Sequence, residues 1–157
     1  MKTLYLLRHG EKEENISQDD YDINLTQKGK EDIAKLAKKL LKREINLDLI
    51  VSSPANRARQ TAEVLVKELN YPRNIMYNEV IYQAFLNELN ETITYTFDTV
   101  NSLLIVGHNP SLAALAYTFC GFREPFDMGD IIRIDFNCNS WVEIGKHNAS
   151  FNFFEKP

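Results

Sequence analysis

The stretch Thr3-Leu4-Tyr5-Leu6-Leu7-Arg8-His9-Gly10 begins as an apolar run and ends in two basic side chains and a glycine. Such a run, cut off by polar residues and glycine, is typical of a buried strand that opens into a loop. Residues 47–51 and 103–106 repeat this pattern. Segments with helical spacing lie between the runs, which predicts a mainly parallel sheet covered by helices.

Four helices are expected between the strands. Thr26 is suited to cap a helix that runs to about residue 43. Pro54 suits the first turn of a second helix, which ends before Pro72. A third strand is expected over residues 75–81 and a third helix over residues 85–100. Asn109 is expected to cap a fourth helix, with Pro110 in its first turn and an end near residue 120.

The C-terminal part of the chain changes character. Residues 131–136 and 141–144 are predicted strands joined by a turn, and residues 150–154 are a further candidate. Residues 11–24 show no periodicity and are expected to form a loop. We therefore expect residues 1–157 to fold as a single α/β domain. Its architecture would be a three-layer sandwich with a mainly parallel central sheet, helices on both faces and an antiparallel C-terminal edge hairpin.

Composition and charge exclude several classes of protein. Hydrophobic residues make up 44% and charged residues 25% of the chain, and the net charge of −4 argues against a general nucleic-acid binder. No apolar run approaches the ~20 residues of a membrane span, and the N-terminal run is too short for a secretory signal. Cys120 and Cys138 do not form a disulfide scaffold. We expect a cytoplasmic protein with no nucleic-acid or membrane partner.

Basic and polar side chains follow three of the predicted strands. They are Arg8 and His9 after the first strand, Ser52 and Ser53 after the second with Arg57 and Arg59 one turn into the next helix, and His108 and Asn109 after the fourth. Crevices in open α/β sheets lie beyond the carboxyl ends of the strands, so we expect these side chains to converge. The third histidine, His147, lies in a polar segment and is expected at the surface.

Two histidines and two arginines at one crevice suit a tetrahedral anion. Arginine presents a planar fork of donors to phosphate oxygens, and a neutral histidine can attack phosphorus. Each residue also has a structural explanation, since Arg57 and Arg59 can be solvated charges and an Arg-His pair can be a local hydrogen bond. Zinc is not supported by any His-x-x-x-His or cysteine pairing. The coincidence at corresponding strand ends favours a phosphate site without metal or cofactor.

Four segments, in order, resemble the histidine phosphatase superfamily, which includes phosphoglycerate mutases and acid phosphatases. They are Leu7-Arg8-His9-Gly10-Glu11, Leu25-Thr26-x-x-Gly29, Ser52-Ser53-Pro54-x-x-Arg57-Ala58-x-Gln60-Thr61-Ala62, and Val106-Gly107-His108-Asn109-Pro110. The resemblance spans residues 3 to about 120. In length, and in the Ser-Ser-Pro and Gly-His-Asn-Pro segments, the chain is similar to the SixA-type phosphohistidine phosphatases.

This resemblance implies roles for particular residues. His9 would attack phosphorus and become a phosphohistidine that water hydrolyses, while Arg8, Arg57 and His108 would hold the phosphoryl oxygens. The family pattern selects Arg57 rather than Arg59, because Arg57 precedes Ala58. Asn15 lies six residues after His9, where the mutase branch often has a phosphate-contacting asparagine.

The proton donor is not part of any matching segment. Larger members of the superfamily use an acidic residue after the third strand, where Glu79 is the first candidate and Glu88 the second; Glu11 is a third. A weak donor suffices more readily when the leaving group is an imidazole, because the P–N bond of phosphohistidine is more labile than a phosphate ester. An alkyl phosphate would depend more on general-acid help.

The expected function is therefore a phosphatase acting on phosphohistidine or another phosphorylated side chain of a protein. Larger relatives carry an insertion that covers the site, whereas this chain has only one helix's worth of residues between the third strand and Leu103. An uncovered site would admit a protein-bound phosphoryl group and water. The alternatives are a broad-specificity phosphomonoesterase acting on small molecules and a phosphate-binding module without turnover.

Overall fold

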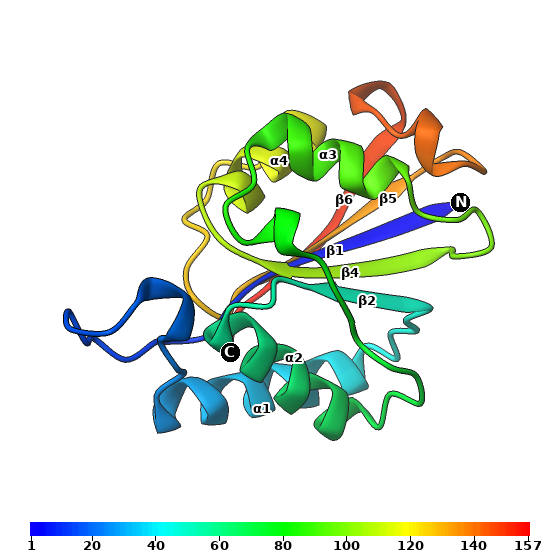
Figure 1. Ribbon diagram of the computed structural model, residues 1–157. Coiled ribbons are helices and arrows are strands. Elements are labelled where there is room, and N and C mark those ends of the chain that lie inside the picture. The colour runs from blue at the N-terminus through cyan, green and yellow to red at the C-terminus, as the bar shows by residue number, and fades with distance from the viewer.

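The computed structural model describes all residues from Met1 to Pro157. A six-stranded sheet with the order β3-β2-β4-β1-β5-β6 forms the central layer (Figure 1). The strands are β1 (Lys2–Arg8), β2 (Leu49–Ser52), β3 (Met76–Tyr77), β4 (Ser102–Gly107), β5 (Ile131–Phe136) and β6 (Ala149–Glu155). Strands β1 to β4 are parallel, whereas β5 runs antiparallel to both β1 and β6.

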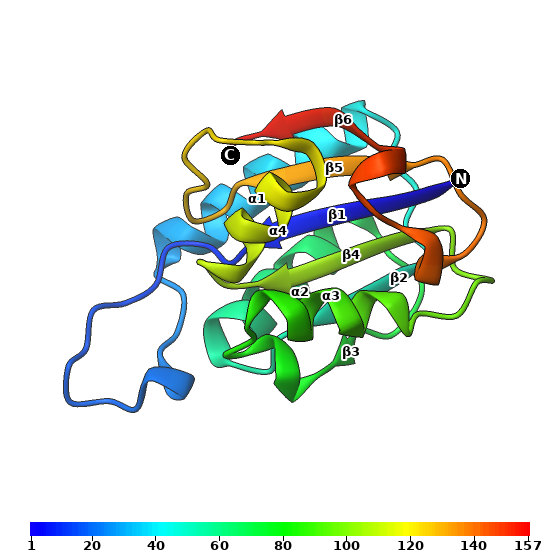
Figure 2. The same ribbon diagram turned by 90° about the horizontal axis from the view of Figure 1, so that it is seen from above.

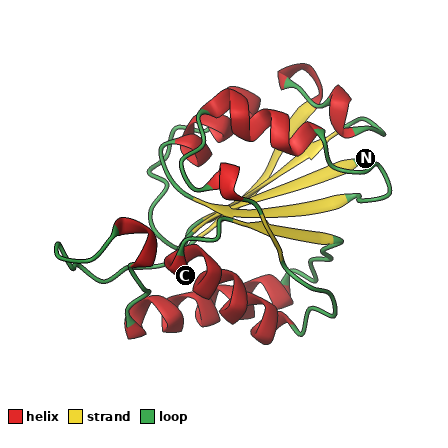
Figure 3. Ribbon diagram, in the orientation of Figure 1, coloured by secondary structure: helices red, strands yellow, loops and turns green.

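Helices cover both faces of this sheet (Figures 2 and 3). Helices α1 (Gln27–Lys42) and α2 (Asn56–Leu69) pack on one face, and α3 (Leu86–Thr94) and α4 (Ser111–Cys120) pack on the other. Alternation along β1 supplies both cores, because Leu4 and Leu6 face α3 and α4 while Tyr5 and Leu7 face α1 and α2. The expected α/β three-layer fold is confirmed. No helix is long and apolar enough to span a membrane.

The predicted cap of α1 is confirmed. The Oγ1 atom of Thr26 accepts a hydrogen bond from the Gly29 N–H at 2.9 Å. The prediction for α2 is wrong by two residues, because the helix begins at Asn56 and Pro54 lies before it. The reason is that Ser53 Oγ accepts from the Ala55 N–H at 3.2 Å, which holds residues 53–55 in a turn ahead of the helix.

The prediction of Asn109 as the cap of α4 is wrong by one residue. Helix α4 begins at Ser111, so Pro110 takes the cap position and lies outside the helix. Asn109 still binds the first turn, since its Oδ1 accepts from the Ala113 N–H at 3.2 Å. Its Nδ2 donates to the Phe126 carbonyl oxygen at 2.8 Å, which draws the residue away from the helix axis.

The elements predicted between residues 75 and 100 are shorter in the structure. Only Met76 and Tyr77 pair with β2, because Asn78 Oδ1 accepts from the Val80 N–H and starts a 3-10 turn over Glu79–Ile81. Helix α3 ends at Thr94 rather than at residue 100. The buried Lys2 ammonium takes the carbonyl oxygens of residues 98 and 100 as acceptors, so this segment forms a connection and not a helix.

The predicted strand at residues 141–144 is wrong. Residues Trp141–Glu143 form a 3-10 helix, and β5 pairs instead with β6, which replaces the predicted partner in the edge hairpin. The Trp141 ring is fully buried, and its Nε1–H donates to the Val100 carbonyl oxygen at 2.8 Å. This burial pulls the segment onto the face covered by α3. Cys120 and Cys138 are free, partly buried thiols.

Candidate active site

The carboxyl ends of β1 and β4 bring two histidines together. Arg8 is in register with Gly107, and the His9 N–H donates to the Gly107 carbonyl oxygen at 3.1 Å. The imidazole rings of His9 and His108, which follow these strand ends, have centroids 5.1 Å apart. The convergence expected from the strand ends is therefore present in the fold.

His9 is buried with one ring nitrogen already engaged. Its Nδ1 lies 2.8 Å from the Gly10 carbonyl oxygen, which can only accept, so Nδ1 carries the proton and the lone pair is on Nε2. Burial, and to a lesser extent the positive neighbours, lowers the pKa of His9 to about 3. His9 therefore presents a neutral imidazole whose Nε2 can act as a nucleophile.

His108 has a different partner. Its Nε2 lies 2.8 Å from the Ser53 hydroxyl, which can either donate or accept. Burial is the main cause that lowers the pKa of His108 to about 4, and the charge of Arg57 adds to it. Ser53 was expected to converge at this edge of the sheet after β2, although the resemblance gave it no role in the reaction.

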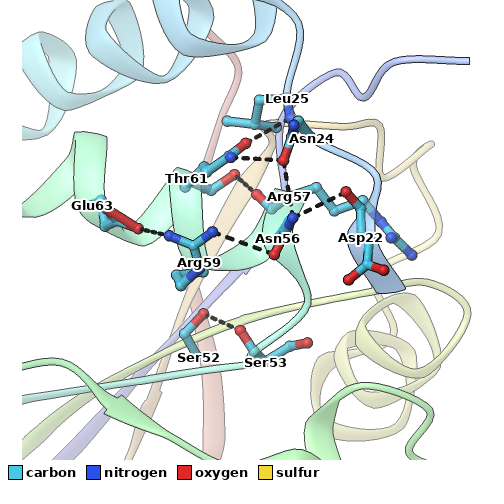
Figure 4. A network of polar contacts seen from close by, with 11 residues as sticks. Asp22, Asn24, Leu25, Ser52, Ser53, Asn56, Arg57, Arg59, Thr61 and Glu63 are labelled. Carbon is cyan, nitrogen blue, oxygen red and sulfur yellow. Dashed lines mark hydrogen bonds and ion pairs between the residues drawn. The ribbon is translucent and has the colours of Figure 1, made fainter. Parts of the chain in front are cut away.

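Arg57 lies in the first turn of α2 and is buried. Its Nη1 donates to the Asp20 carbonyl oxygen at 2.6 Å, and its Nη2 donates to the Asp20 carboxylate at 3.0 Å. Its Nε–H is buried and has no hydrogen-bond partner. Arg59 points elsewhere and binds Glu63 at 2.6 Å and Asn56 at 3.3 Å (Figure 4). The choice of Arg57 over Arg59 is thus consistent with the geometry.

Arg8 resembles Arg57 in having a buried Nε–H without a partner. Its Nη1 donates to the Phe126 carbonyl oxygen at 3.1 Å, while its Nε–H is buried without a partner. Burial lowers the pKa of the Arg8 guanidinium, and the nearby Asp127 opposes that effect. Two buried guanidinium N–H groups without partners, both on arginines whose charge acts on His9, suit the oxygens of a tetrahedral anion.

A cleft of about 490 Å³ opens beside these residues. Its walls are formed by Asp20, Arg57, Tyr82, Gln83, Ala84, Phe85, His108, Asn109, Pro110 and Ser111. Asp20 and Tyr82 were not predicted. No sequence signal singles them out, because Asp20 belongs to an acidic loop without periodicity and Tyr82 follows a short turn. Asp20 is the only acidic residue of the wall.

Of the predicted site residues, Arg57 and His108 line the cleft, whereas Arg8, His9, Asn15 and Glu79 are not part of its wall. Asn15 is exposed, and its side chain binds Ser17 and Gln18 within its own loop. Glu79 is exposed and accepts a hydrogen bond from the Tyr21 hydroxyl at 3.1 Å. The structure therefore does not bring Asn15 or Glu79 into contact with His9, Arg57 or His108.

The other two candidate proton donors are also engaged elsewhere. Glu88 accepts from the Phe85 N–H at 3.0 Å at the start of α3. Glu11 accepts from the Thr26 hydroxyl at 3.2 Å beside the cap of α1. Neither is part of the cleft wall. No group of three or more His, Cys, Asp or Glu side chains is arranged to hold a metal ion.

Comparison with known proteins places this α/β fold and its histidine–arginine cluster in a defined class. The family model of the histidine phosphatase superfamily (branch 1) matches residues 4–91, which is more than half of the chain. The chain belongs to this superfamily, as the sequence motifs predicted. Among curated proteins, none matches the sequence.

Solved structures show the same fold over nearly the whole chain. The protein histidine phosphatase SixA in complex with tungstate is 20% identical, with a TM-score of 0.83 over 98% of this chain and 96% of that chain. A protein of Agrobacterium tumefaciens, provisionally described as a phosphohistidine phosphatase SixA, is 23% identical, with a TM-score of 0.84 over 99% and 98%. A mycobacterial glucosyl-3-phosphoglycerate phosphatase is 15% identical, with a TM-score of 0.67 over 96% and 97%. The fold is that of the SixA structures.

Proposed function

We propose that the chain is a phosphatase of SixA type that hydrolyses a phosphoryl group through a phosphohistidine intermediate on His9. The observation that carries this proposal is the neutral, buried imidazole of His9, whose free Nε2 lies in a cluster with His108, Arg8 and Arg57. A site that only binds phosphate has no need of a desolvated nucleophile in a cluster with two arginines.

The proposed reaction has two displacements at phosphorus. The Nε2 lone pair of His9 forms a bond to phosphorus while the bond from phosphorus to the leaving group breaks, and the leaving group keeps that electron pair and takes a proton from solvent. Arg8 and Arg57 donate hydrogen bonds to the phosphoryl oxygens, whose charge they stabilise in the transition state. Water then attacks the phosphohistidine: its oxygen forms a bond to phosphorus, the bond from phosphorus to Nε2 breaks and a proton returns to solvent, which releases phosphate and restores neutral His9.

We propose a phosphorylated protein, with phosphohistidine first, as the substrate class. The cleft is partly open to solvent, and only η2 (Glu79–Ile81) and the nine-residue helix α3 lie between β3 and β4. The relative with bound tungstate is called a protein histidine phosphatase, and tungstate is a tetrahedral oxyanion like phosphate. A cytoplasmic location without a nucleic-acid or membrane partner is proposed from the composition and the net charge of −4.

The covalent intermediate is tested by rapid acid and base quench of the enzyme with a ³²P-labelled phosphohistidine protein. We expect wild type to carry a base-stable, acid-labile label that disappears in His9→Ala. His147→Ala removes an exposed histidine and serves as the matched control, so it keeps the label. Turnover without any label on wild type, or a label that persists in His9→Ala, would contradict the proposed nucleophile. Neither turnover nor label would instead support a binding module.

A substrate panel separates the two enzymatic alternatives. The rates with a phosphohistidine protein and with sugar phosphates are compared in the presence of a chelator, because arginines supply the positive charge in the proposed mechanism. We expect higher kcat/KM for the phosphoprotein and no effect of the chelator. A clear preference for sugar phosphates would replace the proposed substrate class by small phosphomonoesters.

A further inference from the structure

One end of the Arg57 guanidinium is held by a loop that the sequence motifs do not include. The carbonyl oxygen and the carboxylate of Asp20 together accept from Nη1 and Nη2, at 2.6 and 3.0 Å. Asp20 belongs to the short 3-10 helix η1 (Asp20–Asp22), 37 residues away in the chain. A buried guanidinium bound at two points by the same residue has little freedom to rotate.

The edge of Arg57 that Asp20 leaves unused is the one suited to an anion. A guanidinium can bind two oxygens either through Nη1 and Nη2 or through Nε and Nη2, and the pairs lie on different edges of the plane. Asp20 takes the first edge. The Nε–H on the second edge is buried and unpartnered. With the first edge occupied, the second remains available for the oxygens of a phosphoryl group.

Tyr82 holds Asp20 in turn. Its hydroxyl donates to the same carboxylate oxygen, Oδ2, at 2.6 Å. The Tyr82 ring stands edge-on to the His108 ring, with centroids 5.6 Å apart. Desolvation and the Asp20 hydrogen bond raise the pKa of Tyr82 to about 12, so the hydroxyl keeps its proton. That hydrogen bond is also the main cause that lowers the pKa of Asp20, which therefore stays ionised.

We propose that Asp20 and Tyr82 are positioning residues for phosphoryl binding: Tyr82 orients the Asp20 carboxylate, and Asp20 fixes Arg57 with its Nε–Nη2 edge free for the phosphoryl oxygens. This inference rests on the proposed function, because it assumes that Arg57 binds the transferred group. Neither residue touches the reacting atoms in this scheme. Both act through Arg57.

Two other roles for Asp20 predict different effects on phosphate binding. As an internal anion that competes with phosphate for Arg57, Asp20 would weaken phosphate binding in the wild type. As the proton donor for the leaving group, it would leave phosphate binding unchanged and matter only for substrates with a basic leaving group. Asp20 contacts Arg57 twice, and one of the two contacts is made by a neutral carbonyl oxygen. This arrangement favours the positioning role over the other two.

The experiment measures inorganic phosphate binding by calorimetry for wild type, Asp20→Ala, Asp20→Asn and Tyr82→Phe. Asp19→Ala is the matched control, because it removes the same charge from the same loop at an exposed residue. We expect Asp20→Ala to weaken phosphate binding about tenfold, since a hydrogen bond to a charged group is lost. Asp20→Asn keeps an accepting oxygen and should lose less, Tyr82→Phe should lose an intermediate amount, and Asp19→Ala should bind as wild type does.

Activity measurements on the same variants complete the test. If Asp20 and Tyr82 position Arg57, kcat/KM of their variants should fall by a similar factor for a phosphohistidine protein and for an aryl phosphate with a good leaving group. Tighter phosphate binding in Asp20→Ala than in Asp19→Ala would overturn the proposal in favour of competition. Unchanged binding with a loss confined to poor leaving groups would overturn it in favour of proton donation. Tyr82→Phe carries the test if Asp20→Ala fails to fold.

These outcomes are distinguishable from a failure of the proposed function. Phosphate binding needs no turnover, so the binding results stand even if His9→Ala retains activity. Conversely, wild-type turnover that depends on His9 supports the phosphatase whatever Asp20 does.

Discussion

His9 and His108 share one pocket but differ in what binds their ring nitrogens. The Gly10 carbonyl oxygen beside His9 Nδ1 can only accept, so the lone pair of His9 is confined to Nε2. The Ser53 hydroxyl beside His108 Nε2 can donate to a neutral ring or accept from a protonated one. His108 can therefore change its protonation state without losing its partner. A fixed nucleophile next to an adaptable histidine suits the two steps of the proposed reaction.

Arg57→Lys tests whether the site needs both pairs of guanidinium donors, Nη1–Nη2 and Nε–Nη2. An ammonium group cannot bind Asp20 on one edge and present a second pair of donors on another, so we expect kcat/KM to fall about 100-fold. Steady-state kinetics with a phosphohistidine protein measures this loss. Arg59→Lys is the control, since Arg59 binds Glu63 and Asn56 outside the cleft wall and should retain wild-type activity. Equal activity of the two variants would show that Arg57 does not bind the phosphoryl group through its fork.

The first turn of α1 supports the segment that follows His9, the proposed nucleophile. The Thr26 N–H donates to the Glu11 carbonyl oxygen at 3.0 Å, which ties the cap of the helix to the chain just after His9 and Gly10. At Gly29 the helix backbone lies so close to this segment that a Cβ atom would collide with the Glu11 carbonyl oxygen. The helix thus defines the path of residues 9–11 by direct backbone contact.

Gly29→Ala should disturb both stability and activity. Relieving the collision requires α1 or residues 9–11 to move, and overpacking of this kind costs about 2 kcal/mol of the free energy of unfolding. Gly121→Ala is the control: its φ of +70° makes alanine strained by about 1 kcal/mol, but its Cβ would meet no other atom. Denaturant unfolding and kcat are measured for both. The interpretation fails if Gly29→Ala keeps full activity, or if Gly121→Ala loses activity as strongly.

The burial of two neutral histidines near arginines affects the stability of the whole molecule. It makes the free energy of unfolding fall in acid. His9 and His108 have pKa values of about 3 and 4 in the fold, against an ordinary value of 6.5. The unfolded chain therefore binds more protons than the folded one below pH 6.5. The stability that the neutral histidines contribute is fully present above that pH and is lost as the pH falls through 6.5 toward the folded pKa values of about 4 and 3.

The free energy of unfolding should fall measurably on acidification. Each buried histidine contributes a loss of about 2 kcal/mol at pH 5 relative to neutral pH, from the 1.36 kcal/mol that corresponds to each pKa unit. Urea unfolding at pH 7.5 and pH 5 measures the loss. It should be smaller in His9→Asn and in His108→Asn, whereas the exposed His147→Asn should behave as wild type does. The same loss in all three variants would show that carboxylates, and not the buried histidines, dominate.

Local pattern was sufficient for most of the fold and for the core of the site. Apolar runs that end in Arg8-His9 and Gly107-His108 predict buried parallel strands, and parallel strands end at one edge of a sheet, so the meeting of these residues followed from sequence. The strand predicted at residues 141–144 failed because the alternating pattern does not reveal that the Trp141 indole is bound to Val100 on another element.

The acidic loop marks the limit of prediction from sequence. Residues 11–24 carry no periodicity, so nothing local indicates which of their carboxylates contacts the site. Asp20 meets Arg57 and Tyr82 because the loop folds back onto the first turn of α2, and these contacts join residues 37 and 62 positions apart. The residues that follow the strands are thus determined by sequence, through the geometry of a parallel sheet. The partner that orients Arg57 is decided by tertiary structure, because that contact depends on long-range packing and not on any repeating pattern in the chain.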